Sequence, residues 1–418
     1  MHKSLANRIR RIDIVLKLAE RCNLACPYCY YYFQEFNANN NQPLISADVV
    51  EALPQFFSRT AKETGVNAFN ISLHGGEPLL IKKKRFDSIL KYVKENTPKH
   101  IDLQFSIQTN GVLIDDEWVD LFSKHQVAVG ISLDGTPSTH GKMRPKHNGE
   151  SSYNDAERGL KLVQQAYQDG KLKKVGVLTL MHPEDGEQVL KHIVKKLGVS
   201  SPGLNFPRGG WDSQDSPKWI LHVDKHREVI RYWMDELVFP QFHYIRGISD
   251  LFFSMQSEDA AQYNDISNSL RQHVVTISSE GKILVDDNMF GLGDEFFNSD
   301  LNIFEHSLRD HFTSPLFQEL IAANDHKPPA CEGCQWYRLC KAGPLYNRFS
   351  KVNRFNNKAV ICEVLKMIYE ELAMFSLEVK TITETDLESV LNAPMSITSK
   401  EIYRSLIENH ENLRSIET

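Results

Sequence analysis

The stretch that decides the fold is Cys22-Asn23-Leu24-Ala25-Cys26-Pro27-Tyr28-Cys29, which follows the apolar run of residues 12–18. Three cysteines cannot fill a four-coordinate structural zinc site, but they can hold a [4Fe–4S] cluster whose remaining iron is open to a ligand. An iron atom with an open coordination position indicates a catalytic site. A zinc knuckle and a thioredoxin-like thiol pair are the alternatives, and neither uses the third cysteine.

The composition is that of an ordinary globular protein. The 418 residues are 41% hydrophobic and 24% charged, which is enough for a barrel and a second module. A net charge of −6 argues against a general nucleic-acid binder. The chain has no apolar run long enough for a membrane span and no signal core. Its cysteines gather at 22–29 and 331–362, unlike a secreted disulfide framework, so we expect a cytoplasmic protein.

Residues 12–206 alternate short β-branched runs with longer amphipathic segments. The predicted strands are residues 12–18, 68–73, 101–107, 127–133, 174–180 and 203–206; the predicted helices are residues 46–63, 82–95, 115–124, 153–168 and 184–196. Pro54 predicts a kink or a break in the first helix. The alternation indicates a parallel sheet with crossover helices, hence an α/β fold with a partial (β/α)6 TIM-like barrel. Functional residues should then lie at the carboxyl ends of the strands.

Polar motifs follow three further predicted strands. His74-Gly75-Gly76-Glu77-Pro78 follows the second strand; its glycines permit close approach of the backbone, and Glu77 offers an acceptor for an ammonium group. Gln108-Thr109-Asn110-Gly111 follows the third strand and Ser132-Leu133-Asp134-Gly135 the fourth. Each of the last two also fits an ordinary turn.

The cysteine loop, CxxxCxΦC with Tyr28 as the aromatic residue, resembles that of the radical S-adenosylmethionine (SAM) enzymes, and residues 75–78 resemble their GGEP motif. The resemblance implies a [4Fe–4S] cluster on Cys22, Cys26 and Cys29, whose open iron chelates the amino and carboxylate groups of SAM. It also implies that the side chains or backbone at the following positions contact SAM: Tyr28, Gly75, Gly76, Glu77, Pro78, Gln108, Asn110 and Ser132.

A second group of cysteines consists of Cys331, Cys334, Cys340 and Cys362. The spacing CxxCxxxxxC with a distant fourth cysteine resembles the SPASM domain, the auxiliary-cluster module of peptide-modifying radical SAM enzymes. Four cysteines could equally hold structural zinc. Because the same chain carries the first cysteine motif, we favour a second [4Fe–4S] cluster over zinc. This cluster would carry electrons and not bind SAM.

The chain departs from the full SPASM pattern, which commonly has seven cysteines and two auxiliary clusters. Asp286 stands where the cysteine of a GxxxxC motif is expected, five residues after Gly281, and Pro344 stands where a further cysteine is expected, four residues after Cys340. One auxiliary cluster should therefore remain, so we expect two [4Fe–4S] clusters in all.

Asp287 is the predicted catalytic base. In the related sulfatase-maturing enzymes an aspartate directly follows the position of the missing cysteine and takes a proton from the substrate, and Asp287 matches that position. The alternative is that residues 286–288 form a solvated turn.

Residues 207–272 break the strand–helix alternation. Predicted helices at 219–239 and 242–256 form a bridge, whose aromatic residues we expect in the core: Trp219, Trp233, Phe239, Phe242, Tyr244, Phe252 and Phe253. The expected domains are the barrel (1–210), the helical bridge (211–272), a SPASM-like auxiliary cluster domain (273–370) and a C-terminal helical tail (371–418).

The resemblance implies a radical SAM oxidoreductase that abstracts hydrogen from a side-chain carbon of a ribosomally made precursor peptide and forms a crosslink, for example a cyclophane carbon–carbon bond. The alternatives are a sulfatase-type maturase that oxidises Ser or Cys to formylglycine, and a non-catalytic metal-bound scaffold that binds a peptide. Expected partners are the precursor peptide and a one-electron donor of the flavodoxin or ferredoxin type. The leader of the peptide would dock on the bridge or on a separate recognition protein. We expect no nucleic-acid or membrane partner.

Overall fold

The computed structural model describes residues 11–31, 43–182, 185–206, 208–213, 222–269 and 274–408. Its centre is one eight-stranded sheet of order β6-β5-β4-β3-β2-β1-β7-β8, parallel from β6 to β7, with β8 antiparallel to β7. The strands are β1 (Arg11–Ala19), β2 (Ala68–Gly75), β3 (Asp102–Thr109), β4 (Ala128–Ser132), β5 (Val175–Leu180), β6 (Gly203–Asn205), β7 (Val275–Ile277) and β8 (Ile283–Leu284).

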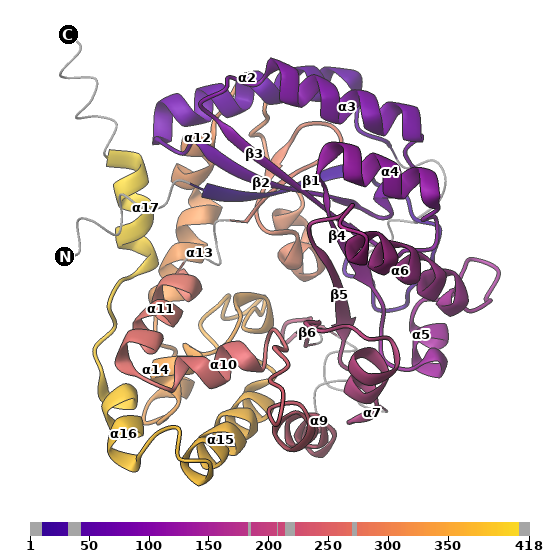
Figure 1. Cartoon of the computed structure of the whole chain (residues 1–418). Coiled ribbons are helices and arrows are strands. Elements are labelled where there is room, and N and C mark those ends of the chain that lie inside the picture. Colours follow the sequence, from indigo (N-terminus) through magenta and orange to yellow (C-terminus); the bar gives the residue numbers. More distant parts are fainter. Residues whose placement is uncertain are drawn as a thin grey trace.

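The first six strands confirm the predicted parallel α/β sheet, in the order of the sequence (Figure 1). The sequence did not predict β7 and β8. Strand β7 is three buried residues that pair with Ile14, Val15 and Leu16 of β1. A run of three residues is too short to show the alternation of apolar and polar residues that predicts a strand. Only its pairing with β1 therefore defines it as a strand.

Helices cover the outer face of the barrel strands (Figure 1). They are α2 (Ala47–Thr64), α3 (Lys83–Asn96), α4 (Asp116–His125), α5 (Pro137–Met143), α6 (Tyr153–Gln168) and α7 (Gln188–Leu190), which continues into the π-helical segment η2 (Lys191–Lys196). Ser46 caps α2 by accepting the Val49 N–H at 3.2 Å. Of the kink or break predicted at Pro54, the break is wrong, because α2 runs through this buried proline without interruption.

The second half of the chain is mainly helical. Its longer helices are α9 (Val223–Glu236), α10 (Ser249–Ser254), α11 (Glu258–Ser269), α12 (Leu308–Thr313), α13 (Pro315–Asp325), α14 (Tyr337–Cys340), α15 (Cys362–Glu378), α16 (Glu384–Asn392) and α17 (Ser399–Glu408). Short 3-10 turns join them: η4 (Asp287–Leu292), η5 (Asp294–Phe296), η6 (Pro329–Cys331) and η7 (Leu345–Asn347), with η1 (Pro78–Leu80) after β2. Helix α15 packs against α9, and α17 packs against α13 and α2, so one hydrophobic core runs from the barrel to the C-terminal helices. None of the helices in the described ranges is long and apolar enough to cross a membrane.

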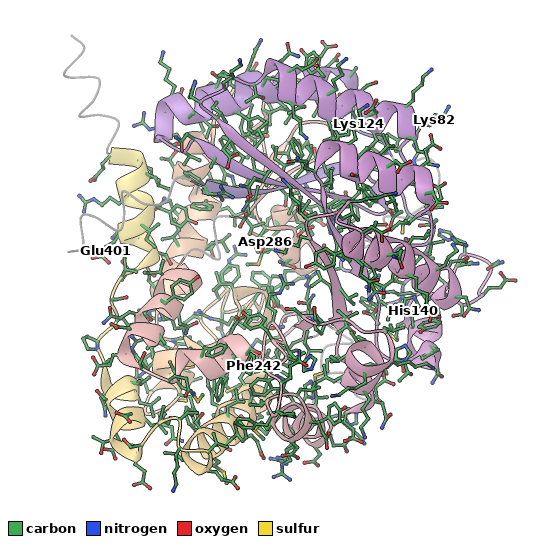
Figure 2. All side chains as sticks on the ribbon, viewed as in Figure 1. Lys82, Lys124, His140, Phe242, Asp286 and Glu401 are labelled. Atoms are coloured by element: carbon green, nitrogen blue, oxygen red, sulfur yellow. The ribbon has the colours of Figure 1, made fainter. Side chains whose placement is uncertain are left out.

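The prediction that the bridge aromatics are core residues is correct for two of them and wrong for four. Trp233 and Phe252 are buried. The side chains at 239, 242, 244 and 253 are exposed by 58%, 40%, 36% and 44% respectively, and Figure 2 labels Phe242 among them. The reason is that α10 is only six residues long and buries one face, while the first three of these aromatics lie in the connection before it. Trp219 lies outside the described residues.

Candidate active site

The loop after β1 carries the first three cysteines. Cys22 is buried, and Cys26 and Cys29 are partly buried. Local contacts shape the loop: the Leu24 N–H donates to Cys22 Sγ at 3.4 Å, and the Cys29 N–H donates to the Cys26 carbonyl at 3.2 Å. His147 Nε2 lies 3.0 Å from the Cys22 carbonyl oxygen. The loop is therefore held by its own backbone and by a neighbouring loop.

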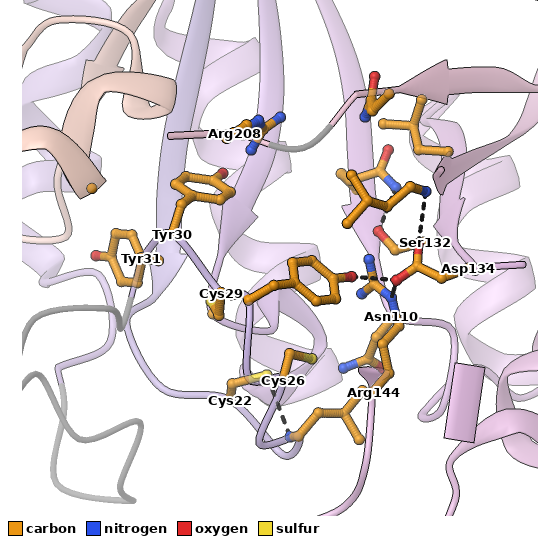
Figure 3. A pocket seen from close by; sticks show the side chains of 18 of the residues that line it. Cys22, Cys26, Cys29, Tyr30, Tyr31, Asn110, Ser132, Asp134, Arg144 and Arg208 are labelled. Carbon is orange, nitrogen blue, oxygen red and sulfur yellow. Dashed lines mark hydrogen bonds and ion pairs between the residues drawn. The ribbon is translucent and has the colours of Figure 1, made fainter. Parts of the chain in front are cut away.

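These three thiols line one cavity of about 380 Å³ (Figure 3). Burial raises the pKa of Cys22 well above its usual value and raises the pKa of Cys26 to about 12. The thiols of Cys22 and Cys26 are therefore protonated at neutral pH in the metal-free chain, and iron must displace these protons when it binds.

Gly75 and Gly76 line the same cavity at the end of β2. Gly75 has φ of 144°, and a Cβ atom there would collide with the Ala19 carbonyl oxygen at the end of β1. The Gly76 N–H donates to that same oxygen at 2.8 Å. The two glycines thus bring the ends of β1 and β2 together below the cysteine loop.

Glu77 and Pro78 do not line the cavity. The Glu77 carboxylate is 1% exposed and accepts hydrogen bonds from Thr109 Oγ1 (2.7 Å), Asn110 N (2.8 Å) and Leu79 N (3.0 Å). Burial raises its pKa, and these hydrogen bonds oppose that rise. In this structure Glu77 ties the end of β2 to the end of β3; its contact with the ammonium group of SAM stays a prediction.

The predicted residues at the ends of β3 and β4 do meet at the cavity. Gln108 Nε2 donates to Ser132 Oγ at 2.8 Å, across adjacent strands (Figure 3). Asn110 Nδ2 donates to Asn23 Oδ1 of the cysteine loop at 2.8 Å. The geometry therefore brings Gln108, Asn110 and Ser132 to the cysteine loop, while their contact with SAM stays a prediction.

Asp134 and Arg144 form a part of the cavity wall that the sequence did not predict. Arg144 Nε donates to Asp134 Oδ2 at 2.7 Å, the Tyr28 hydroxyl donates to the same oxygen, and the guanidinium lies 5.5 Å from the centre of the Tyr28 ring. Burial alone would raise the pKa of Asp134, but Arg144 and these hydrogen bonds lower it. The position of Asp134 at a strand end was the available signal; nothing in the sequence marked Arg144.

Asp287 lies behind the cavity wall and not on it. Its carboxylate is 7% exposed, and its Oδ2 accepts from Lys17 Nζ at 2.6 Å and from the Tyr30 hydroxyl at 2.9 Å. His74 Nδ1 lies 3.2 Å from Lys17 Nζ and 3.7 Å from the same carboxylate oxygen. Tyr30 and His74 line the cavity, so these two side chains separate Asp287 from it.

The charges in this group are well defined. Burial raises the pKa of Asp287, but Lys17 and its neighbours outweigh burial and hold the pKa below its usual range. Burial and Lys17 lower the pKa of His74 to about 3. At neutral pH Asp287 is therefore a carboxylate and His74 a neutral imidazole. Lys17 is a residue that the sequence analysis missed, although a lysine inside an apolar strand was a visible signal.

The alternative of a solvated turn at 286–288 does not describe this segment. Asp287 is buried, and residues 287–292 form η4, which Asp286 caps by accepting the Asn288 N–H at 3.0 Å. Burial and the charge of Asp287 raise the pKa of Asp286 to about 6. Figure 2 places Asp286 between the sheet and the C-terminal half of the chain.

The second group of cysteines surrounds a separate, small cavity. Cys331, Cys334, Cys340 and Cys362 all line it, together with Trp336 and other aromatic side chains. All seven cysteines lie in described parts of the chain, and none is in a disulfide.

Thiolates are ligands of both zinc and iron–sulfur clusters, so both kinds of centre are considered at the two cysteine groups. A tetrahedral zinc ion with Zn–S bonds of about 2.3 Å needs sulfur atoms about 3.8 Å apart. The described ranges contain no group of three or more His, Cys, Asp or Glu that could hold one metal ion. A [4Fe–4S] cluster binds each thiolate through a different iron atom, so its cysteines stand farther apart. The three-thiolate site would hold such a cluster beside a cavity of the size that small ligands occupy.

Comparisons with known proteins agree with this geometry. Residues 16–197 match the model of the Radical SAM superfamily. The chain is 24% identical over 377 residues to a cysteine-type anaerobic sulfatase-maturating enzyme of Clostridium novyi, covering 87% of this chain and 96% of the relative. It is 34% identical over 165 residues, 39% of this chain and 38% of the relative, to a serine-type anaerobic sulfatase-maturating enzyme of Klebsiella aerogenes.

Two solved structures share the fold. Native anSMEcpe with bound AdoMet and Cp18Cys peptide superposes with a TM-score of 0.70 at 19% identity, covering 91% of this chain and 99% of that chain. Streptococcus suis SuiB bound to the precursor peptide SuiA gives a TM-score of 0.55 at 16% identity, covering 87% and 79% respectively.

The fold and the cysteine-lined cavity at its strand ends define an iron–sulfur enzyme built on a partial barrel. Residues 16–197 of the chain are a radical SAM domain. The protein is an enzyme of that class, with SAM and [4Fe–4S] clusters as its cofactors.

Proposed function

We propose that this protein is a peptide maturase that abstracts a hydrogen atom from a side-chain carbon of a ribosomally made precursor peptide and forms an intramolecular crosslink, for example the carbon–carbon bond of a cyclophane. The second group of cysteines holds an auxiliary [4Fe–4S] cluster in this proposal. An external flavodoxin or ferredoxin supplies single electrons.

One observation carries the proposal: the cavity has two walls of different origin. The cysteine loop and the ends of β2, β3 and β4 form the first wall. Asn205, Arg208, Asn288 and Leu292 form the second, together with Ser213 and Gly291. A substrate held by the second wall lies beside the cysteine loop, and the walls come from segments far apart in the chain. The precursor peptide bound to SuiB supports this class of substrate.

Tyr30, Asp287 and Lys17 provide a path for a proton. When bound, SAM and the first cluster supply hydrogen-atom abstraction from an unactivated carbon. Crosslinking of two C–H groups removes two hydrogen atoms, so one proton and one electron remain to be removed after the abstraction. Tyr30 Oη can accept this proton as its own proton moves to Asp287 Oδ2, 2.9 Å away. Lys17 keeps the carboxylate ionised before the transfer, since it holds the pKa of Asp287 low.

Arg208 orients Tyr30 for this role. The guanidinium lies 4.4 Å from the centre of the Tyr30 ring, and both side chains line the cavity (Figure 3). Cation–π contacts of this kind fix the ring plane and therefore the direction of the hydroxyl group.

A sulfatase-type maturase is the second candidate. The anaerobic sulfatase-maturating enzymes among the relatives favour it, because one of them matches over 377 residues. In that case the same proton path would serve oxidation of a Ser or Cys side chain to formylglycine. Against it stands the single auxiliary group of four cysteines.

One experiment separates the candidates. The reconstituted enzyme is incubated without oxygen with SAM, a reductant and either a sulfatase-derived peptide or the short peptides encoded beside its gene. Both Ser oxidation and crosslinking remove two hydrogen atoms, so the mass alone does not decide. A hydrazide probe captures formylglycine but not a crosslink, whereas a crosslink suppresses fragmentation within the ring in tandem mass spectrometry. Turnover of the gene-neighbour peptide to a hydrazide-unreactive, fragmentation-resistant product is the expected result; hydrazide capture of the product would overturn the crosslinking proposal.

A further inference from the structure

Arg348 is a buried cation that forms no ion pair with the side chains that the structure describes. The side chain is 0% exposed and follows directly after η7. Its Nε donates to the carbonyl oxygens of Phe355 and Asn357, both at 3.1 Å. Within the described ranges, Nη1 and Nη2 have no hydrogen-bond acceptor. A buried guanidinium with two unpaired nitrogens is costly, so Arg348 is suited to an anion that the described residues do not supply.

Another buried arginine in the same half of the chain shows the ordinary solution. Arg338 donates through Nη1 and Nη2 to the two oxygens of Asp265, at 2.6 Å and 2.9 Å. Among the described residues Arg348 forms no such ion pair with a carboxylate. A carboxylate of the chain thus pairs with the buried guanidinium of Arg338, whereas no described carboxylate pairs with that of Arg348.

Arg348 lies beside the segment that carries Cys362, because the carbonyl of the preceding residue, Asn347, accepts the Val360 N–H at 2.8 Å. Burial lowers the pKa of Arg348, and the charges of Tyr337, Cys331 and Cys340 oppose that lowering. Two of these three groups are cysteines of the second site. Trp336, which lines the cavity among the four cysteines, is also buried, and its Nε1–H has no acceptor among the described residues. Two unsatisfied donors thus stand around one group of thiols.

We propose that Arg348 is the buried countercharge of the second [4Fe–4S] cluster and that, together with Trp336 Nε1–H, it raises the reduction potential of that cluster. This inference rests on the auxiliary cluster of the proposed function. Four thiolates give the cluster a net negative charge in both oxidation states, one unit more after reduction. A nearby buried cation therefore stabilises the reduced form more than the oxidised form, and a higher potential suits a cluster that accepts an electron from the substrate.

The test is a redox titration of the full chain in which Cys22, Cys26 and Cys29 are replaced by Ala, so that only the second cluster gives an electron paramagnetic resonance signal. Arg348→Met should retain iron while the ratio of oxidised to reduced cluster at fixed potential rises about tenfold, which is about 59 mV for a one-electron couple. Arg348→Lys keeps the charge and should shift less. Trp336→Phe should shift the ratio in the same direction by a few-fold.

Lys358 offers a matched control. Its ammonium is 35% exposed and paired with Glu363 at 3.2 Å, and its charge also acts on Cys331. Because water screens an exposed charge, Lys358→Met should change the ratio by less than about twofold.

The outcomes separate cleanly. An Arg348→Met potential indistinguishable from that of Lys358→Met overturns the inference. If Arg348→Met is folded by circular dichroism but binds no iron, its potential cannot be measured, and Trp336→Phe decides in its place. If that variant does not fold, Trp336→Phe decides: an unchanged potential overturns the inference, and a lowered one supports it. Zinc or no metal in the parent triple variant would instead refute the auxiliary cluster of the proposed function.

Discussion

The two cysteine sites of this enzyme contain the same ligand atoms but differ in their surroundings. Three thiols at the end of β1 open onto a cavity of about 380 Å³ lined by polar strand ends. Four thiols of the C-terminal half surround a cavity of about 20 Å³ lined partly by Trp336, Tyr337 and Tyr369. Small-molecule sites usually occupy about 300–1,000 Å³, so only the first site has room for an organic ligand. A missing fourth ligand and an adjoining cavity together make a site reactive, whereas four ligands and close packing leave only electron transfer.

Replacing a cysteine at each site is the strongest way to break this comparison. Cys26→Ala should abolish the release of 5′-deoxyadenosine from SAM, because the first cluster is lost, while iron falls from about eight to about four atoms per chain. Product chromatography and anaerobic iron analysis measure the two effects.

The matched variant is Cys334→Ala, which should also remove about four iron atoms but leave SAM cleavage within a few-fold of the native rate. Equal loss of SAM cleavage in both variants would contradict the division of labour between the sites.

Asp287→Asn tests whether the carboxylate behind the cavity of the first cysteine site accepts a proton. The Asn side chain keeps a polar group beside Lys17 but cannot accept a proton, so crosslinked product should fall by about 10²-fold or more while cluster content and SAM cleavage persist. The product is quantified by mass spectrometry alongside 5′-deoxyadenosine. Asp286→Asn is the control, because Asp286 caps η4 and has no place in the proton path; a similar fall in that variant would assign the effect to the turn.

Lys17→Met tests how much the buried ion pair contributes to stability. Removal of one partner leaves Asp287 as an uncompensated buried charge, which should lower the free energy of unfolding by about 3–5 kcal/mol. The double variant Lys17→Met/Asp287→Asn should recover much of this loss in urea denaturation. Arg231→Met removes an exposed pair with Glu371 and should cost less than about 1 kcal/mol. Equal costs in the two single variants would mean that burial of the Lys17 pair is energetically unimportant.

The same pair has a defined pH dependence. The pKa of Asp287 is lowered in the folded protein, so its stabilising contribution is full above the unfolded value of about 3.9 and is lost as the pH falls through the folded value. The destabilisation by Lys17→Met should therefore shrink as the pH is lowered to about 4 and below. A difference that stays constant as the pH falls from about 4 to about 2 would contradict the ion pair.

The smallest expected effect concerns the polar strand ends that make the first site different from the second. Gln108→Ala removes one hydrogen-bonding side chain next to Ser132 and should raise the KM for SAM about tenfold with little change in iron content. Steady-state kinetics of 5′-deoxyadenosine release measure this. Gln104→Ala, on the same strand and away from the cavity, should leave the KM unchanged.

The sequence alone determined the partial barrel and the first site, because both depend on local patterns. Period-two runs with intervening helices predicted β1 to β6, and strand-end motifs predicted that Gln108, Asn110 and Ser132 lie near the cysteine loop. These predictions hold because the ends of neighbouring parallel strands must meet at one edge of the sheet.

Only the tertiary structure decided which charges meet in the interior. Lys17 and Asp287 are 270 residues apart in the sequence, and Arg144 reaches Asp134 from a loop without a recognisable pattern. The chain also adds β7 beside β1, places Asp287 behind Tyr30 and not on the cavity, and leaves four predicted core aromatics exposed. Periodicity reports which face of an element is apolar, whereas the partner of a buried charge depends on long-range packing, which no local pattern encodes.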